Sequence, residues 1–317
     1  MIKGLAITPP ILGRISIGRI VVKDNKRLPE KDDQFTITSQ VQNREGWVNH
    51  PLDEELRKSA SNGKIRSIPV RMLFNDPDLN LRAEYSMFDR QNGRPLCVGN
   101  GETCRRSTDS GVENLPCPSP DHCQLAKGGL CKPYGRLNVQ IDASDELGTF
   151  IFRTTGYNSI RSLAARLSYY QAVSGDLLSC LPLQLRLRGK STTQSHRSAI
   201  YYVDLTVRDE VSIEDAIVEA KQMNERRKEC GYDQVALDNA ARLGFGNAAF
   251  EFSEDEILDI VEEYFPEAEG GSTEGSYAQG NETVIVQASS ARIATTTKPS
   301  LRDKLDRKAA GFVGTAA

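Results

Sequence analysis

Five cysteines crowded into one short stretch constrain this chain more than any other feature of its sequence. Of the seven cysteines among 317 residues, five lie within 35 residues, namely Cys97, Cys104, Cys117, Cys123 and Cys131. The stretch between them, 98–130, is rich in Gly, Pro, Ser and Asp and has no apolar periodicity, so hydrophobic burial can do little to order it. Thiolates around a tetrahedral zinc ion would supply that order. We therefore expect a zinc-binding insertion over residues 97–131.

The spacing of these cysteines leaves the ligand set open. Gaps of six, twelve, five and seven residues separate them, unlike the CxxC pairs of a standard zinc finger. Four sulfurs suffice, and the set that we favour is Cys104, Cys117, Cys123 and Cys131. Cys97 is then a spare ligand or a buried thiol, and His122 is an alternative to one sulfur. The competing interpretation is a group of free or buried cysteines that binds no metal.

The composition is that of an ordinary soluble protein. No stretch approaches the ~20 consecutive apolar residues that a membrane span needs. Residues 1–18 lack both the charged start and the cleavage site of a signal peptide. We expect a cytoplasmic protein with no membrane partner, in which reducing conditions keep the thiols free to bind metal. The odd number of cysteines also argues against a closed disulfide framework.

Charge is distributed unevenly along the chain. Residues 209–269 contain 18 acidic and 5 basic residues, whereas residues 1–208 contain 29 basic and 21 acidic residues. A basic body followed by an acidic segment is compatible with nucleic-acid contact by the first part and with partner contact, or self-shielding, by the second. Solvated faces that bind nothing would give the same pattern.

The first 208 residues alternate mainly in the manner of β-strands. Residues 68–74 and 79–87 alternate around the turn-forming segment 75–78, which predicts a hairpin. Further strands are expected at 136–141 and 149–153, followed by an antiparallel pair at 183–187 and 200–207.

One helix is expected among these strands. It begins at Asn158 or Ser159, ends by Gly175, and places on one face Ile160, Leu163, Ala164 and Leu167. The predicted fold of residues 1–208 is therefore α+β, an antiparallel sheet core with one central helix and the cysteine-rich insertion.

After residue 208 the pattern changes to helices. Ser212 caps a helix that Gly231 ends, a second helix covers 234–243, and a third covers 253–265. We therefore expect an acidic helical extension at 209–266. The Gly, Ser, Thr and Ala-rich remainder, 267–317, is predicted to be a disordered linker and tail.

Basic and aromatic residues in the body are candidates for a phosphate-binding surface. The basic candidates are Arg153, Arg161, Arg166, Arg186, Arg188, Lys190 and Arg197. The candidates for base stacking are Tyr157, Tyr169 and Tyr170, although core packing would explain them equally well. The segment 189–192 has the ending of a phosphate-binding P-loop but lacks its first glycine, so we interpret it as a strand end.

The cysteine pattern favours a structural role over a catalytic one. A closed site of four sulfurs is structural, whereas a catalytic zinc keeps one position open for water. A metal-dependent hydrolase or nuclease is the alternative function, and its candidate residues are His122, His196, Asp121 and Asp204. A third possibility is a recombination accessory protein that binds single strands.

Short motifs in the centre of the chain resemble a known family. They are Pro116-Cys117, Cys123, Cys131-Lys132-Pro133, Arg136-Leu137-Asn138-Val139, Leu147-Gly148 and Phe152-Arg153-Thr154-Thr155-Gly156-Tyr157-Asn158. Together they resemble the recombination directionality factor-like proteins of phages and integrative elements, over about residues 4–207.

The resemblance implies a non-enzymatic accessory protein that binds a large serine integrase on its DNA and switches it from integration to excision. It implies a zinc-ribbon-like site on the same four favoured cysteines, and it transfers no catalytic residue. The expected partner is a site-specific recombinase or another DNA-processing protein, and DNA is a candidate second partner.

Overall fold

The computed structural model describes residues 10–23, 26–43, 46–60, 62–141, 148–191, 199–245 and 264, with side chains left out for 19–31 and 245. The chain divides into two units, 1–275 and 276–317, and all described residues lie in the first. The expected helix at 253–265, apart from Tyr264, and the tail at 267–317 lie outside the described residues.

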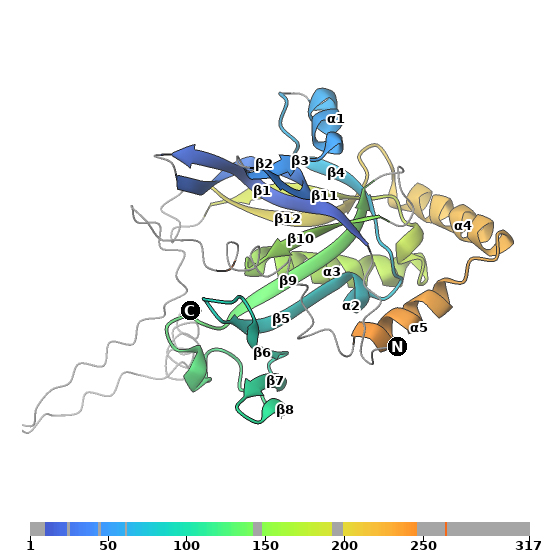
Figure 1. The fold of residues 1–317 in the computed structure, drawn as a ribbon. Coiled ribbons are helices and arrows are strands. Elements are labelled where there is room, and N and C mark those ends of the chain that lie inside the picture. The colour runs from blue at the N-terminus through green and yellow to red at the C-terminus, as the bar shows by residue number, and fades with distance from the viewer. Residues whose placement is uncertain are drawn as a thin grey trace, which may run out of the picture. The chain divides into compact units, whose positions relative to one another are not determined.

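The described residues form twelve β-strands, five α-helices and two short 3-10 helices (Figure 1). The strands are β1 Ile11–Lys23, β2 Lys26–Asn43, β3 Gly46–Asn49, β4 Ser67–Arg71, β5 Leu81–Phe88, β6 Pro95–Gly99, β7 Thr103–Thr108, β8 Gly111–Pro116, β9 Lys132–Ile141, β10 Thr149–Thr154, β11 Leu183–Lys190 and β12 Ile200–Val207. The helices are α1 Pro51–Ser59, α2 Pro77–Asn80, η1 Gln124–Ala126, α3 Tyr157–Ser174, η2 Leu178–Cys180, α4 Ile213–Glu229 and α5 Gln234–Phe245.

All twelve strands belong to one sheet that forks at β9. One path runs in the order β3-β2-β1-β10-β9-β5-β6-β7-β8, and a branch adds β4, β11 and β12 beside β9. Only the β1–β10 pair is parallel among the described strands. The fold is therefore α+β with a mostly antiparallel sheet, as the sequence predicts.

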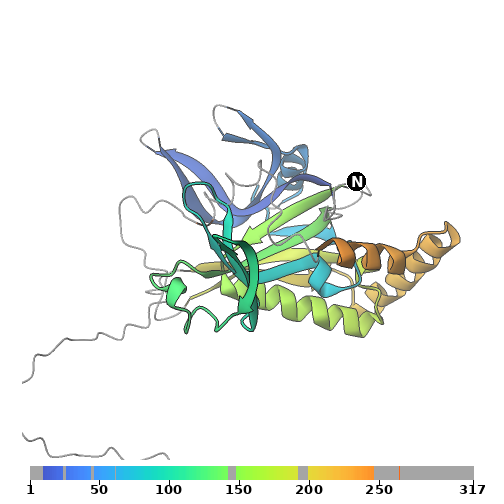
Figure 2. The same ribbon diagram turned by 60° about the horizontal axis from the view of Figure 1, so that its bottom comes forward.

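The sheet curls around one main hydrophobic core. Phe35 on β2, Leu163 on α3 and Val203 on β12 are each fully buried in the same cluster. The chain preceding β4 joins β2 to β11, because Phe35 N donates to Ile65 O at 2.7 Å and Leu187 N donates to Arg66 O at 2.9 Å. The core thus lies inside the curl, with α3 along one side of it (Figure 2).

Helix α3 confirms the expected central helix and corrects its start. Ile160, Leu163 and Leu167 are buried at helical spacing, and Gly175 ends the helix with a left-handed φ of 66°. Ala164, which the periodicity places on the buried face, is exposed. The N-cap is Gly156 rather than Asn158 or Ser159.

The Ser159 hydroxyl is engaged elsewhere, which explains why it caps nothing. It accepts a hydrogen bond from Val203 N at 3.0 Å and so ties α3 to β12. The strands predicted at 136–141, 149–153, 183–187 and 200–207 correspond to β9, β10, β11 and β12, and the last two pair antiparallel as expected.

The hairpin predicted for residues 68–87 is wrong. β4 and β5 run in the same direction and pair in succession along β9, with Val70 opposite Ile141 and Leu81 opposite Leu137. The intervening residues begin a helix instead of reversing the chain, because the Asp76 carboxylate accepts from Asp78 N at 3.0 Å and caps α2.

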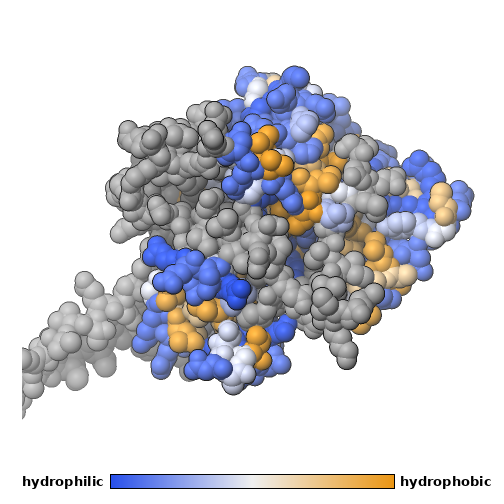
Figure 3. Space-filling model, in the orientation of Figure 1, coloured by the Kyte–Doolittle hydropathy of each residue, from blue (hydrophilic) through white to orange (hydrophobic). Residues whose placement is uncertain are grey.

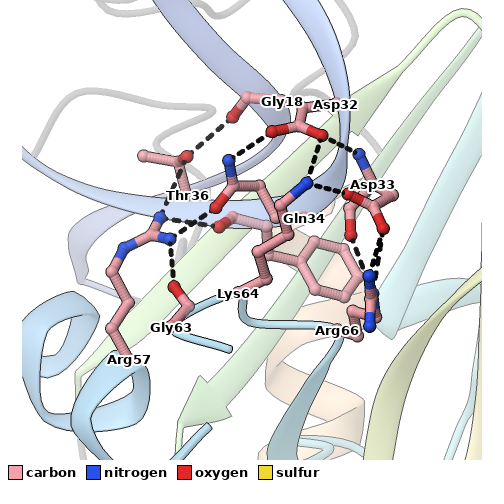
Figure 4. A network of polar contacts seen from close by, with 10 residues as sticks. Gly18, Asp32, Asp33, Gln34, Thr36, Arg57, Gly63, Lys64 and Arg66 are labelled. Carbon is pink, nitrogen blue, oxygen red and sulfur yellow. Dashed lines mark hydrogen bonds and ion pairs between the residues drawn. The ribbon is translucent and has the colours of Figure 1, made fainter. Parts of the chain in front are cut away.

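Helix α1 was not expected and is held by a buried polar network. Arg57 reaches from α1 to the Gln34 and Thr36 side chains of β2 and to the Gly63 carbonyl (Figure 4). Its guanidinium also pairs with Asp53 at 2.6 Å. The Asp53 carboxylate, which is only 1% exposed, accepts a further bond from Ile37 N at 2.9 Å.

A second part of this network joins the middle of β2 to the chain before β4. Lys64 pairs with Asp32 at 2.9 Å and also with Asp33, which in turn pairs with Arg66. The hydrogen bonds from Lys64 and Arg66 hold the pKa of the Asp33 carboxyl well below its usual value. The carboxylate therefore stays ionised in the folded protein at neutral pH.

The helices after residue 208 pack beside the end of β4 and the start of α2. Ser212 caps α4 as predicted, accepting from Asp215 N at 3.1 Å, and Ala216 and Ala220 are fully buried. Glu219 pairs with Arg71 at 2.7 Å, and Arg242 of α5 pairs with Asp76 at 2.7 Å.

The surface drawn in Figure 3 is hydrophilic over α1, with apolar residues in separate patches elsewhere on that face. Among the described helices, none has the length and apolar character that crossing a membrane requires.

We predict that Arg57→Ala lowers the free energy of unfolding by about 2–3 kcal/mol, because it leaves the buried Asp53 carboxylate without its cation. Chemical denaturation monitored by circular dichroism measures this loss. Lys58→Ala removes an exposed charge from the next position of α1 and is the matched control, with an expected change within ~0.5 kcal/mol. Equal stability of the two variants would contradict the assigned role of Arg57.

Candidate functional site

The five clustered cysteines lie on one projecting arm of the sheet, residues 95–132, which we call the cysteine module. Its strands β6, β7 and β8 form an antiparallel meander that continues outward from β5 (Figure 1). Cys97 lies on β6 and Cys104 on β7, whereas Cys117 follows β8, Cys123 precedes η1 and Cys131 precedes β9. The chain therefore presents all five sulfurs from one compact arm.

The register of β6 and β7 explains why Cys97 and Cys104 meet. Cys97 is opposite Arg106 and Gly99 is opposite Cys104, so all four residues share one face of the ribbon. A Cβ at Gly99 would lie 2.6 Å from the Cys104 Cβ. The absence of a side chain at Gly99 thus makes room for Cys104 to fold over the strand toward Cys97.

The five thiols interact electrostatically with one another. Burial raises the pKa of Cys131 to about 12, and the neighbouring sulfurs that raise it further are Cys97, Cys117, Cys123 and Cys104. Burial also raises the pKa of Cys104 to about 11, with a contribution from a hydrogen bond with Cys97. The charges of the four favoured cysteines and of Cys97 thus influence one another within the module.

Arg106 is the cation of this cluster. Its Nη2 lies 3.9 Å from the Cys104 Sγ, and a hydrogen bond with Cys97 raises the pKa of the guanidinium. The charges of Cys97, Cys104 and Cys123 contribute in the same direction. A fixed positive charge beside the sulfurs would partly offset the negative charge of a group of thiolates.

The thiols are not arranged as a closed metal site in this structure. In the part of the chain that the structure describes, no group of three or more His, Cys, Asp or Glu side chains is placed so that it could hold a metal ion. All seven cysteines are free thiols. His122, the alternative ligand, is exposed on the surface of the module.

The cysteine module has little hydrophobic core of its own. Only Val98, Cys104 and Ala126 are buried apolar residues between 98 and 130, whereas Leu125 and Leu130 are almost half exposed. Each fully buried apolar side chain stabilises a fold by about 1.5–3 kcal/mol. Burial on this scale cannot match the cost of ordering more than thirty residues, so the module depends on other bonds.

One residue from far along the chain, Tyr264, completes the base of the module. It is fully buried and packs edge-on against Phe88 and Tyr134, with ring centroids 4.8 and 6.1 Å apart. Its hydroxyl contacts backbone groups of Leu130 and Lys132, on either side of Cys131. Burial raises the pKa of Tyr264, so the phenol keeps its proton. No sequence signal indicated this contact, because it joins positions more than 130 residues apart.

The predicted phosphate-binding surface is assembled only in part. A groove of about 590 Å³ runs between α3 and the β11–β12 hairpin, and its lining residues are Asn158, Arg161, Ser162, Ala165, Arg166, Tyr169, Lys190 and Tyr202. We call it the basic groove. Tyr169 is 52% exposed, whereas Tyr170 is buried in the main core and is not available for stacking.

The other basic candidates lie elsewhere or are engaged. Arg186 pairs with Asp209, and Arg153 does not line the groove. Arg188 pairs with Asp204 at 2.7 Å beside the groove, and Arg197 lies outside the described residues.

Asp204, a candidate residue of the hydrolase alternative, has a structural role. Its carboxylate is 3% exposed and accepts hydrogen bonds from Ser162, Arg166 and Arg188 at 2.9, 3.2 and 2.7 Å. Burial by itself would raise the pKa of Asp204, but these three donors lower it below the usual value. The second candidate, His196, lies outside the described residues, and Asp121 is exposed.

The fold and these features define an α+β protein that carries a thiol-rich module on one arm of a forked, mostly antiparallel sheet. A family model described as Gp3-like, recombination directionality factor-like, matches residues 12–208. Because this match covers more than half of the chain, the chain belongs to that family, which confirms the resemblance of the short motifs. The family links the chain to recombination in phages and mobile elements and to the recombination machinery.

The match ends one residue after β12, so α4 and α5 lie beyond the shared part. No curated protein and no solved structure matches the chain.

We predict that Gly99→Ala opens the cysteine module. The added methyl group would meet the Cys104 Cβ and, at 2.8 Å, the Thr103 carbonyl, so the β6–β7 pair must shift at a cost of ~1–3 kcal/mol. Alkylation of the thiols, followed by mass spectrometry, should proceed faster at Cys104 in this variant. Ser107→Ala, at an exposed position of β7, is the control and should leave the alkylation rate unchanged. An unchanged rate in Gly99→Ala would rule out the proposed close approach.

Proposed function

We propose that this protein is a non-enzymatic accessory factor that binds a site-specific recombinase and directs the outcome of recombination in a phage or integrative element. The family match over residues 12–208 carries this proposal. Two features of the structure support it: a projecting module rich in thiols and a basic groove on the opposite branch of the sheet. Both are suited to holding a partner rather than to transforming a substrate.

The cysteine module, in this proposal, is held by one zinc ion. The donor chemistry fits, because five cysteines on one arm of the sheet supply the soft sulfur ligands that zinc prefers. The favoured ligands remain Cys104, Cys117, Cys123 and Cys131. Cys97 is the alternative that the structure supports, since it hydrogen-bonds with Cys104, whereas exposed His122 gains no such support. A bound zinc would supply a structural cross-link, and the chain's own Arg106 would offset part of the thiolate charge.

We predict about one zinc ion per chain in protein purified under reducing conditions. Cys117→Ser and Cys131→Ser should each lower zinc affinity strongly and make the module sensitive to protease, because each variant leaves only three sulfurs of the favoured set. Cys230→Ser, at an exposed cysteine far from the module, is the control and should retain the metal.

Elemental mass spectrometry measures the metal content, and a parallel Cys97→Ser variant decides between the two ligand sets. Zinc-free wild-type protein with the same protease resistance as Cys117→Ser would overturn the zinc assignment.

The basic groove is, in this proposal, a contact surface for the recombinase–DNA complex. Arg161 is exposed, and no acidic partner is found for it among the described residues. Within the described residues, Lys190 makes only a neutral hydrogen bond, which it donates to Asn158 at 2.7 Å. These two cations are thus available to meet acidic side chains or phosphates, and such contacts steer association in a salt-dependent way.

We predict that Arg161→Glu combined with Lys190→Glu weakens binding to the recombinase on its attachment-site DNA by about tenfold, which corresponds to ~1.4 kcal/mol. The weakening should diminish as salt is raised. Lys221→Glu, at an exposed position of α4, is the control. Surface plasmon resonance with recombinase alone, DNA alone and the complex identifies which component meets the groove. Failure of the wild-type protein to bind any of the three would contradict the proposed function.

A further inference from the structure

Tyr264 lies at the junction where the cysteine module joins the body of the protein. It is a fully buried side chain from beyond the family-matching part of the chain, and it forms a separate aromatic cluster with Phe88 and Tyr134. Phe88 ends β5 and Tyr134 lies near the start of β9, so the ring fills the corner where these strands lead into the module.

The hydroxyl of Tyr264 takes part in the hydrogen-bond ladder between β5 and β9. Ser86 and Lys132 are opposite each other in the register of these two strands. Lys132 N donates to the Tyr264 hydroxyl at 3.0 Å, and the hydroxyl contacts Ser86 O as a donor. The phenol oxygen therefore connects the two strands at the last rung before the module.

The same hydroxyl contacts the backbone on both sides of Cys131. Leu130 O lies 3.0 Å from it as a second possible acceptor, and Lys132 N is the donor on the other side. The Lys132 side chain also holds the tyrosine. Its Nζ donates to Tyr264 O at 3.2 Å and lies over the ring, 5.0 Å from the ring centroid. Tyr264 thus holds the backbone on both sides of Cys131, and the Lys132 side chain holds Tyr264 in turn.

We infer that Tyr264 is a positioning residue for the thiol cluster, which holds the backbone at Cys131 so that this sulfur stays directed toward the other four. The inference rests on the proposed zinc site, in which Cys131 is a ligand. It assigns to Tyr264, a residue beyond the part that matches the family, a role in building the module. Groups of this kind, which orient a ligand without touching the metal, typically change metal affinity by about 10- to 100-fold when they are removed.

The test compares three variants by competition for zinc with a chromophoric chelator. Tyr264→Phe keeps the ring and removes only the hydroxyl, and we expect zinc affinity to fall roughly 10- to 100-fold. Tyr232→Phe removes the hydroxyl of an exposed tyrosine and should have no effect. Phe88→Leu loosens the aromatic packing and keeps the hydroxyl, so it should lower thermal stability more than zinc affinity.

A spectroscopic readout separates positioning from general stability. With Co²⁺ in place of zinc, the intensity of the sulfur-to-cobalt charge-transfer band follows the number of thiolate ligands. We expect Tyr264→Phe to weaken this band and Phe88→Leu to leave it unchanged. Zinc affinity and cobalt spectrum equal to those of the wild type in Tyr264→Phe would overturn the inference while the zinc site stands.

A wild-type protein that binds neither metal would instead refute the zinc site, and the positioning role would then be decided by alkylation. In that case the thiol of Cys131 should be alkylated faster in Tyr264→Phe than in Tyr232→Phe if the role is correct, and at the same rate if it is wrong.

Discussion

The hydrogen-bond ladder of β9 is the constraint on which the rest of the structure depends. This strand pairs with β10 through residues 135–139, with β5 through residues 132–137, and with β4 at its far end. Leu137 and Val139 are fully buried, so the strand is fixed by packing as well as by hydrogen bonds. Both branches of the sheet and the end of the cysteine module follow from its position, since Cys131 immediately precedes it.

The elements that the sequence predicted correctly have local signals strong enough to act alone. Gly175 adopts a left-handed conformation that ends α3, and Ser212 caps α4 through its own side chain. The prediction of a hairpin over residues 68–87 is wrong because its turn residues also suit the start of a helix. Only the pairing of β4 with β9 decides between the two. Helix α1 was missed because its stability comes from Arg57 and its distant partners, which no periodicity reveals.

Some features of the candidate site are likewise visible in the sequence, whereas others depend on contacts between residues that are far apart in the chain. The crowding of cysteines is visible in the sequence, and the structure shows that their thiols are close enough to influence one another. The inclusion of Cys97 follows from the strand register, which spacing alone does not give. Tyr264 could not be found from the sequence at all, because its partners are backbone groups more than 130 positions earlier. The ligand set itself stays a prediction.

The part of this protein that folds together is larger than the part that matches the family, because α4 and α5 pack against the matching part. The family match stops at residue 208, yet Ala216 and Ala220 belong to the main core, and Glu219 neutralises Arg71 at the end of β4. A chain shortened to the matching part would keep every described strand but expose an apolar surface and lose that ion pair. A protein made of the matching part alone would need other residues to cover the same end of the sheet, so the boundary of the family match is not the boundary of the folded unit.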